Sequence, residues 1–241
     1  MKYLTIDTTT KVTAVALAED GLLIGEGFLH TLKMHSERLI PMLDQLLTAA
    51  AWTLQDLDMI GVMRGPGSFT GIRIGIATAQ GLAQVLKLPL LGVVSLNALA
   101  WAGFGRTEDI VPILDARKNE WYTARYCWMP GEAKADCLTS PQALPTDQWL
   151  KQLKQLDRSI CFVGDAASKS MGQIKDVLGE RAVILPEYLS LPRGAYAARA
   201  VWQRWQETGC GEQVEPYYIR FSEAEVKWAL KEEARRSEGN E

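Results

Sequence analysis

A glycine-rich run at positions 65–71 has the residue types that proteins use to bind anions, and it reads Gly65-Pro66-Gly67-Ser68-Phe69-Thr70-Gly71. It lies between an apolar run at 59–63, which predicts a buried strand, and residues 72–86, which predict a helix. A glycine turn between a strand and a helix directs backbone N–H groups at an anion. The candidate anion-binding residues are Gly65, Gly67, Ser68 and Thr70. The run lacks the lysine of a P-loop and does not match G-x-G-x-x-G, so a tight connection that needs small residues explains it equally well.

A carboxylate ends the first predicted strand. Residues 3–6 are followed by Asp7, Thr8, Thr9 and Thr10, and such a turn can hold hydrated Mg²⁺ and phosphate. An Asx turn that stabilises the hairpin is the alternative. The second half repeats the pattern, because a predicted strand at 110–114 ends at Asp115, which is therefore a candidate for ligand binding across a domain cleft or for a structural ion pair.

The chain has only two histidines, His30 and His35. A helical zinc pair needs a spacing of four residues, whereas a spacing of five places the two rings on different faces. No nucleophile-elbow motif surrounds Ser68. The sequence therefore predicts no metal ligands and no catalytic residues.

Two predicted helices carry unusual faces. In the helix at about 36–51, one apolar stripe contains Leu39, Met42, Leu43, Leu46, Leu47 and Ala50. In the helix at about 71–86, small residues recur every four positions, at Gly71, Gly75, Ala79 and Ala83, with Ala77 and Gly81 beside them. Glycine inside a helix costs roughly 0.5–1 kcal/mol relative to alanine, which close packing offsets. This ridge of small residues packs either on the chain's own sheet or on a helix of a second protein.

Composition limits the class of protein. The 241 residues carry a net charge of -3, are 47% hydrophobic and include four separated cysteines without a C-x-x-C motif. These values predict a globular, cytoplasmic protein with reduced thiols, without a signal peptide or membrane span, and without a broad basic face for nucleic acid.

Predicted strands and helices alternate along the whole chain, which is typical of an α/β protein. We predict an N-terminal α/β domain at 1–104 and a C-terminal α/β domain at 105–221, followed by a charged helical tail at 222–241. A helix at about 193–206 is a candidate to pack back on the first domain. The segment 130–147 contains three prolines and is predicted to be a loop.

Several motifs together resemble one known family. They are the strand ending Asp7-Thr8-Thr9, the helix opening His35-Ser36-Glu37-Arg38-Leu39, the run from Arg64 to Gly75, the segment Leu114-Asp115-Ala116-Arg117-Lys118-Asn119-Glu120 and the exit Pro216-Tyr217-Tyr218-Ile219-Arg220. In this order they are similar to the TsaB family, formerly called YeaZ. The similarity covers at least residues 1–128 and the exit segment.

The resemblance implies an actin-like/Hsp70-like ATPase (ASKHA) fold of two α/β domains, each with a mixed sheet and helices. It implies a non-catalytic subunit needed to make N6-threonylcarbamoyladenosine (t6A) at position 37 of tRNAs that read codons starting with A. Its implied partners are the catalytic subunit TsaD, which it binds as a heterodimer, and the ATPase TsaE. It is expected to form a homodimer when alone, to contact tRNA indirectly or slightly, and to need no cofactor itself, with ATP or ADP and Mg²⁺ bound in the complex.

The same resemblance implies that the two helices described above bind TsaD. The expected interface residues are Leu39, Met42, Leu43, Leu46, Gly71, Gly75 and Ala79. A charge at Gly75 or Ala79 is therefore expected to block the complex. The metal-binding histidine pair of the TsaD family has one counterpart here, His35, because Leu39 occupies the second place. The turn Val163-Gly164-Asp165-Ala166 resembles the fold's nucleotide turn but lacks its further glycines.

Two other functions fit some of these residues. A nucleotide-dependent phosphotransferase of the same superfold would use Asp7 and Asp115 around Mg²⁺. A metallopeptidase is disfavoured by the histidine count.

Overall fold

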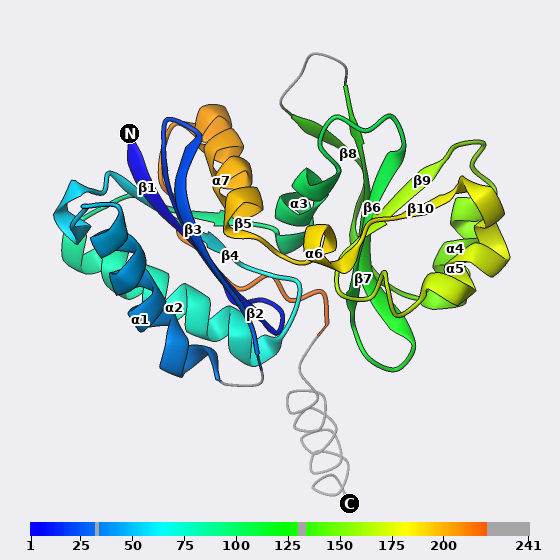
Figure 1. The fold of residues 1–241 in the computed structure, drawn as a ribbon, viewed down its shortest axis with the longest axis horizontal. Helices are drawn as coiled ribbons and strands as arrows, with labels where there is room; N and C mark the ends of the chain where they lie inside the picture. The colour runs from blue at the N-terminus through cyan, green and yellow to red at the C-terminus, as the bar shows by residue number, and fades with distance from the viewer. Residues whose placement is uncertain (32–33, 130–133, 221–241) are drawn as a thin grey trace, which may run out of the picture.

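The computed structural model describes residues 1–31, 34–129 and 134–220, so the predicted tail at 222–241 lies outside the described residues. Two five-stranded mixed sheets form two halves side by side (Figure 1). The first sheet has the order β3 (Leu22–His30), β2 (Val12–Glu19), β1 (Lys2–Asp7), β4 (Met59–Met63) and β5 (Leu90–Val93). The second has the order β10 (Ala182–Ile184), β9 (Ile160–Val163), β6 (Asp109–Asp115), β7 (Glu120–Trp128) and β8 (Ala135–Pro145).

The two halves share one topology. In each, the first strand pairs antiparallel with the second and the second with the third, while the first pairs parallel with the fourth and the fourth with the fifth. The strands that end at Asp7 and at Asp115 therefore occupy equivalent central positions in their sheets. The predicted architecture of two α/β domains with mixed sheets is confirmed.

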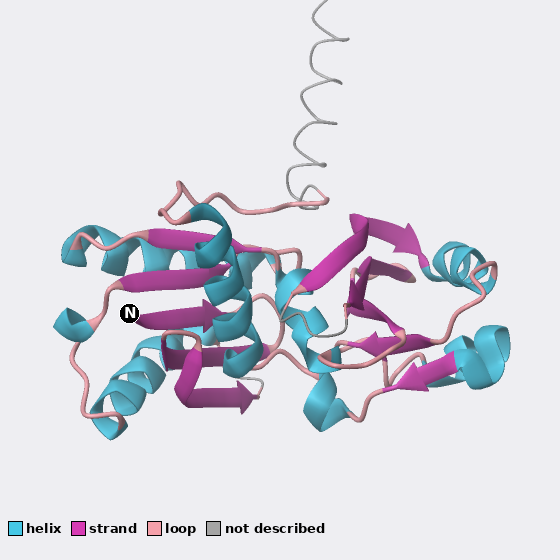
Figure 2. Ribbon diagram, turned by 90° about the horizontal axis from the view of Figure 1, so that it is seen from above, coloured by secondary structure: helices cyan, strands magenta, loops and turns pink. Residues whose placement is uncertain are grey.

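Helices cover both faces of the first sheet. Across both halves, the helices of the described residues are α1 (His35–Ala49), α2 (Phe69–Leu86), α3 (Ser95–Ala100), α4 (Thr146–Lys154), α5 (Met171–Leu178), α6 (Glu187–Ser190) and α7 (Gly194–Thr208). Short 3-10 turns lie at Leu54–Asp56, Trp101–Gly103 and Gly179–Arg181. Helices α1 and α2 lie on one face, and α7 crosses the opposite face (Figures 1 and 2). None of the helices in the described ranges combines the length and apolar character that crossing a bilayer requires.

Alternation along β1 explains this three-layer arrangement. Successive side chains of a strand point to opposite faces of the sheet. Leu4 and Ile6 belong to the core beneath α1 and α2, whereas Tyr3 belongs to the core beneath α7. The Tyr3 hydroxyl donates to the Ala198 carbonyl of α7 at 3.0 Å. Helix α7 therefore returns from the C-terminal part of the chain to complete the first half.

The segment predicted to be a loop at 130–147 contains β8, so that prediction is wrong. Strand β8 lies at the edge of the second sheet and pairs only with β7. An edge strand tolerates proline because its outward N–H groups need no ladder partner. Pro141 and Pro145 are therefore compatible with the strand.

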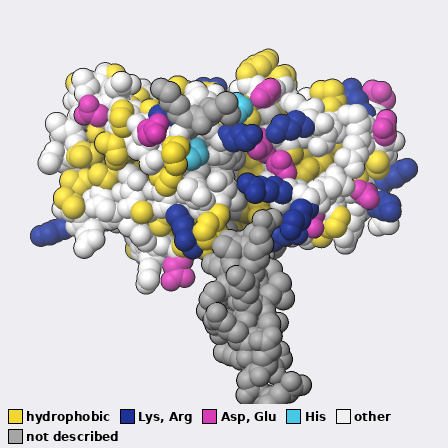
Figure 3. Space-filling view, turned by 90° about the horizontal axis from the view of Figure 1, so that it is seen from below, with side chains coloured by type: hydrophobic (Ala, Val, Ile, Leu, Met, Phe, Trp, Pro, Cys, Tyr) yellow, Lys and Arg dark blue, Asp and Glu magenta, His cyan; other side chains and the backbone are white. Residues whose placement is uncertain are grey.

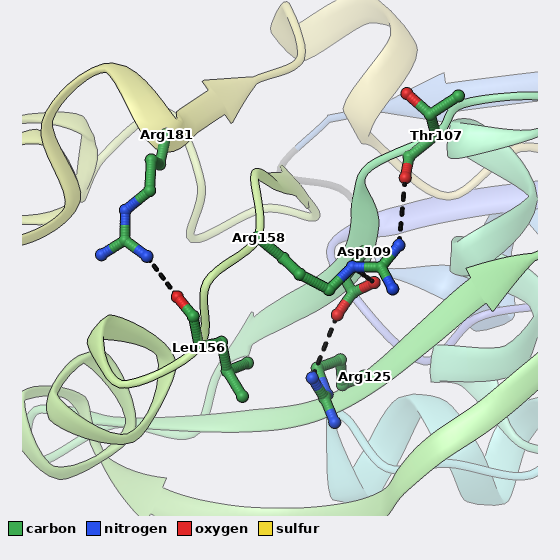
Figure 4. A network of polar contacts seen from close by, with 6 residues as sticks. All are labelled: Thr107, Asp109, Arg125, Leu156, Arg158 and Arg181. Carbon is green, nitrogen blue, oxygen red and sulfur yellow. Dashed lines mark hydrogen bonds and ion pairs between the residues drawn. The ribbon is translucent and has the colours of Figure 1, made fainter.

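A buried carboxylate is paired with two arginines at the start of β6 (Figure 4). Asp109 is 0% exposed and lies 3.0 Å from Arg125 and 3.1 Å from Arg158. Arg158 also donates to the Thr107 carbonyl at 3.4 Å. Because Arg125 is on β7 and Arg158 precedes β9, the carboxylate joins three strands of the second sheet.

Candidate functional site

The glycine-rich run at 65–71 forms the connection between β4 and α2. Gly65 has a φ of 110°, in the region that favours glycine. Ser68 is the N-cap of α2, and its hydroxyl accepts from the Gly71 N–H at 3.3 Å. The turn and the cap thus stop the strand and start the helix within a few residues.

This connection packs tightly against the turn between β1 and β2. The Ser68 N–H donates to the Thr9 carbonyl at 2.6 Å, and the Thr8 hydroxyl donates to the Gly71 carbonyl at 2.7 Å. A Cβ atom at Gly67 would overlap the Thr9 carbonyl oxygen, and one at Gly71 would overlap the Thr8 carbonyl oxygen. The glycines therefore permit two backbone segments to touch.

Asp7 lies in the same junction and forms the predicted Asx turn. Its side chain is 3% exposed, and Oδ1 accepts from the Thr9 N–H at 2.9 Å and the Thr9 hydroxyl at 2.7 Å. Burial raises the pKa of the Asp7 carboxyl, while the two Thr9 hydrogen bonds act in the opposite direction. Asp7 thus forms the Asx turn that the sequence offered as the alternative to a site for Mg²⁺ and phosphate.

His35 ties the first turn of α1 to the same junction. Its Nε2–H donates to the Thr10 carbonyl at 2.9 Å, because a carbonyl can only accept. Nδ1 is then the acceptor for the Thr13 hydroxyl at 2.7 Å. Both ring nitrogens are satisfied in the neutral form, and burial lowers the pKa of the imidazole. This contact was not predicted, since the sequence separates His35 from Thr13 by a whole strand.

We expect His35 to make the stability of the chain fall as the pH falls through about 6.5, the ordinary imidazole pKa. Folding lowers the pKa of His35, so the unfolded chain binds more protons in this range and acidification favours unfolding. Urea unfolding at a series of pH values should show a shallower loss for His35→Gln than for the wild type. His30→Gln, which changes an exposed histidine, is the control and should follow the wild type. Equal pH dependence in all three proteins would contradict this role.

Asp115 lies on the second half, apart from the glycine connection. The Asp115 N–H donates to Asp165 Oδ1 at 3.1 Å, and the Asp115 Oδ1 accepts from the Arg117 N–H at 2.8 Å. Burial raises the pKa of Asp165, and Lys11 of the β1–β2 turn opposes that shift. Lys and Arg side chains gather where the two halves meet (Figure 3).

The predicted anion-binding residues thus divide into two groups. Those at the glycine connection and the β1–β2 turn come together in one packed junction: Asp7, Thr8, Thr9, Gly65, Gly67 and Ser68. Thr70 is exposed on the first turn of α2, and Asp115 belongs to the second half. Among the described residues, no group of three or more His, Cys, Asp or Glu side chains could hold a metal ion.

The apolar stripe of α1 packs on the chain's own sheet, which corrects the predicted interface. Leu39, Met42 and Leu43 are at most 8% exposed. A Cβ at Gly27 of β3 would meet Met42 Cε at 3.0 Å, and one at Gly25 would meet Leu46 at 3.1 Å. Leu39, Met42 and Leu43 thus belong to the core beneath α1, and Leu46 is half-buried against it, so this stripe faces the chain's own sheet.

The ridge of small residues on α2 also faces inward. Ala79 is 0% exposed, and Gly71 and Gly75 are buried against Thr8. The alternative that the ridge packs on the chain's own sheet is therefore correct. A charge at Gly75 or Ala79 would disrupt the fold itself and would not report on partner binding.

The outer surfaces of these helices carry a different set of residues. Ile40 of α1 is 54% exposed and Val85 of α2 is 81% exposed. On α2, Ala77 and Gly81 are exposed, and a Cβ at Gly81 would meet nothing within 4 Å. We call this surface the outer α1–α2 face; it comprises Ile40, Asp44, Thr48, Ala77, Gly81 and Val85. The half of the molecule that bears it shows scattered hydrophobic and few charged side chains (Figure 3).

Comparison with known proteins places the chain in one family. The family model of TsaD, described as tRNA N6-adenosine threonylcarbamoyltransferase, matches residues 30–228. A protein of Bacillus subtilis named tRNA threonylcarbamoyladenosine biosynthesis protein TsaB is 35% identical over 228 residues, which cover 95% of this chain and 98% of the relative. The chain belongs to the TsaB family. The TsaB protein of Escherichia coli is 41% identical over 129 residues, 52% of this chain and 55% of its own.

Solved structures agree with this TsaB assignment. A Pseudomonas aeruginosa protein described as similar to peptidase YEAZ superposes with a TM-score of 0.75 at 28% identity, covering 91% of this chain and 99% of its own. The activator of the 2-hydroxyisocaproyl-CoA dehydratase from Clostridium difficile has a TM-score of 0.52 at 10% identity, covering 86% of this chain and 95% of its own. That level of similarity shows the fold alone. The predicted actin-like ATPase architecture is confirmed.

The exit segment of this TsaB chain packs on its own surface. Tyr218 stacks on Phe69 at 4.9 Å and accepts from Arg73 at 2.9 Å. Arg220 lies 2.6 Å from Glu120, so the segment links the start of α2 to β7 of the second half. The aromatic and basic side chains of the exit segment are therefore engaged in packing of the chain end.

Proposed function

We propose that this chain is a non-catalytic subunit in the synthesis of t6A on tRNA, and that it binds a TsaD-type catalytic subunit through the outer α1–α2 face. The similarity to TsaB proteins and to the TsaD family model supports the pathway. The observation that carries the interface is the exposure of Ile40 on α1 and of Val85 on α2, where Val85 continues the helical row of the small residues Ala77 and Gly81. Large exposed apolar side chains mark interaction surfaces, and small neighbours let a partner helix approach closely.

An accessory role agrees with the chemistry of the junction. Asp7 is hydrogen-bonded within its own turn, and Ser68 donates to the Thr9 carbonyl. The groups that a phosphotransferase would turn toward phosphate and metal are thus engaged in holding β1, β4 and α2 together. In this proposal, binding of ATP or ADP with Mg²⁺ and contact with the TsaE-type ATPase are properties of the assembled complex. With a net charge of -3, the chain contributes only a minor contact to tRNA.

Light scattering coupled to size exclusion tests the partner proposal. The chain alone is expected to form a homodimer at high concentration, because the same apolar face would otherwise remain in water. Addition of TsaD is expected to replace the homodimer with a one-to-one complex. A chain that stays monomeric alone and forms no complex with TsaD would contradict the proposal.

A further inference from the structure

Residues of α7 and α3 from one side and of β7 and β8 from the other line a cavity between the two halves. Its volume is about 280 Å³, and its walls include Arg64, Asn97, Trp101, Tyr126, Arg204 and Glu207. None of the residues of the Asp7 junction and none of the outer α1–α2 face lines it. The proposed function therefore leaves this cavity unexplained.

Among the charged side chains that line this cavity, that of Arg64 has no hydrogen-bond acceptor in the described part of the chain. Its Nε is buried without a hydrogen-bond partner, and its guanidinium lies 5.4 Å from the centroid of the Tyr217 ring. The backbone holds the residue in place, because the Arg64 N–H donates to Val93 at 2.9 Å and its carbonyl accepts from Tyr217 at 2.7 Å. An N–H that is removed from water without an acceptor destabilises the folded chain, and a bound acceptor would recover that loss.

The acidic groups around the cavity are already engaged. Glu212 accepts from Arg204 at 3.0 Å and from the Gly92 N–H at 3.1 Å. Glu207 lies 3.2 Å from Lys134 and accepts from Gln203 at 3.1 Å. Neither carboxylate is therefore placed as the counter-ion of Arg64.

A second donor joins Arg64 at the cavity wall. The Tyr126 hydroxyl donates to Asn97 Oδ1 at 2.5 Å, which leaves the Asn97 amide N–H₂ as a donor. The cavity thus presents donors from Arg64 and Asn97 beside the aromatic surfaces of Trp101 and Tyr126.

We propose that this cavity binds a small oxyanion, a phosphate or carboxylate group, with Arg64 as its principal ligand. A planar guanidinium forms two parallel hydrogen bonds with either group. A volume of about 280 Å³ suits a small metabolite, since pockets for larger ligands extend to roughly 1,000 Å³. The site is independent of the TsaD interface and concerns the isolated chain.

Isothermal titration of the full chain with inorganic phosphate and, separately, with citrate tests this site and distinguishes the two chemistries. We expect one of them to bind with one-to-one stoichiometry, and Arg64→Gln to weaken binding by about tenfold or more, the effect of losing a charge-assisted pair. Arg64→Lys keeps the positive charge but not the planar guanidinium, so its affinity should lie between those of the wild type and Arg64→Gln. Lys175→Gln removes an exposed charge from α5 in the second half and should bind as the wild type does.

Thiol labelling of Cys137, which lines the cavity, gives a readout inside the site. Mass spectrometry of the labelled peptides should show that the bound oxyanion slows labelling of Cys137 in the wild type but not in Arg64→Gln, while exposed Cys210 is unaffected. Absence of binding of both probes at millimolar concentration would overturn the proposal, as would equal binding by Arg64→Gln. Because TsaD is absent from both experiments, neither outcome depends on the proposed function.

Discussion

Gly71→Ala is expected to destabilise the folded chain by about 3 kcal/mol or more, the upper range for overpacking a tight contact. The added Cβ would overlap the Thr8 carbonyl oxygen, and backbone atoms on both sides would have to move. The contact joins β1 to α2 and includes the hydrogen bond from the Thr8 hydroxyl to the Gly71 carbonyl. Urea unfolding followed by circular dichroism measures the effect.

Gly81→Ala is the matched control, because it places the same methyl group on the same helix. Nothing lies within 4 Å of that position, so we expect the change to stabilise α2 by roughly 0.5–1 kcal/mol. If both variants changed the free energy of unfolding by the same amount, the description of the junction would be wrong.

Gly81→Arg is expected to abolish stable binding of TsaD while the chain remains folded. The large cation would stand on the outer α1–α2 face, where a docked helix would leave it buried without a counter-ion. An unpaired buried charge costs several kcal/mol, which corresponds to at least a hundredfold loss of affinity. Co-purification with tagged TsaD and a titration monitored by light scattering measure the loss.

Gly172→Arg controls for the substitution itself. Gly172 is an exposed helical glycine of α5 with nothing within 4 Å, and it belongs to the second half. This variant should bind TsaD as the wild type does. Wild-type affinity in Gly81→Arg, or equal loss in both variants, would show that the outer α1–α2 face is not the interface.

Much of the fold follows from local patterns in the sequence. Apolar runs that end at Asp7 and Asp115, and the glycine connection before α2, each predict an element that the structure contains. Strand β8 was missed because Pro141 and Pro145 signal a break, and the sequence does not show that the strand lies at an edge.

The sequence could not predict which side of α2 faces the sheet. Two rows of small residues run along α2, one through Gly71, Gly75 and Ala79 and the other through Ala77 and Gly81. Helical periodicity gives both rows but does not say which one faces the sheet. That choice depends on the position of Thr8, which the β1–β2 turn brings against the first row. The sequence did not single out Arg64 as a ligand candidate, because the burial of its Nε without an acceptor and its place in the cavity wall depend on tertiary packing.

The most direct test of the central claim is a threonylcarbamoylation assay of tRNA adenosine 37 with purified TsaD and TsaE, with and without this chain. The proposal predicts that modification requires the chain, that the chain alone transfers nothing, and that Gly81→Arg fails where Gly172→Arg succeeds. Full modification by TsaD and TsaE without the chain, or transfer by the chain alone, would contradict it.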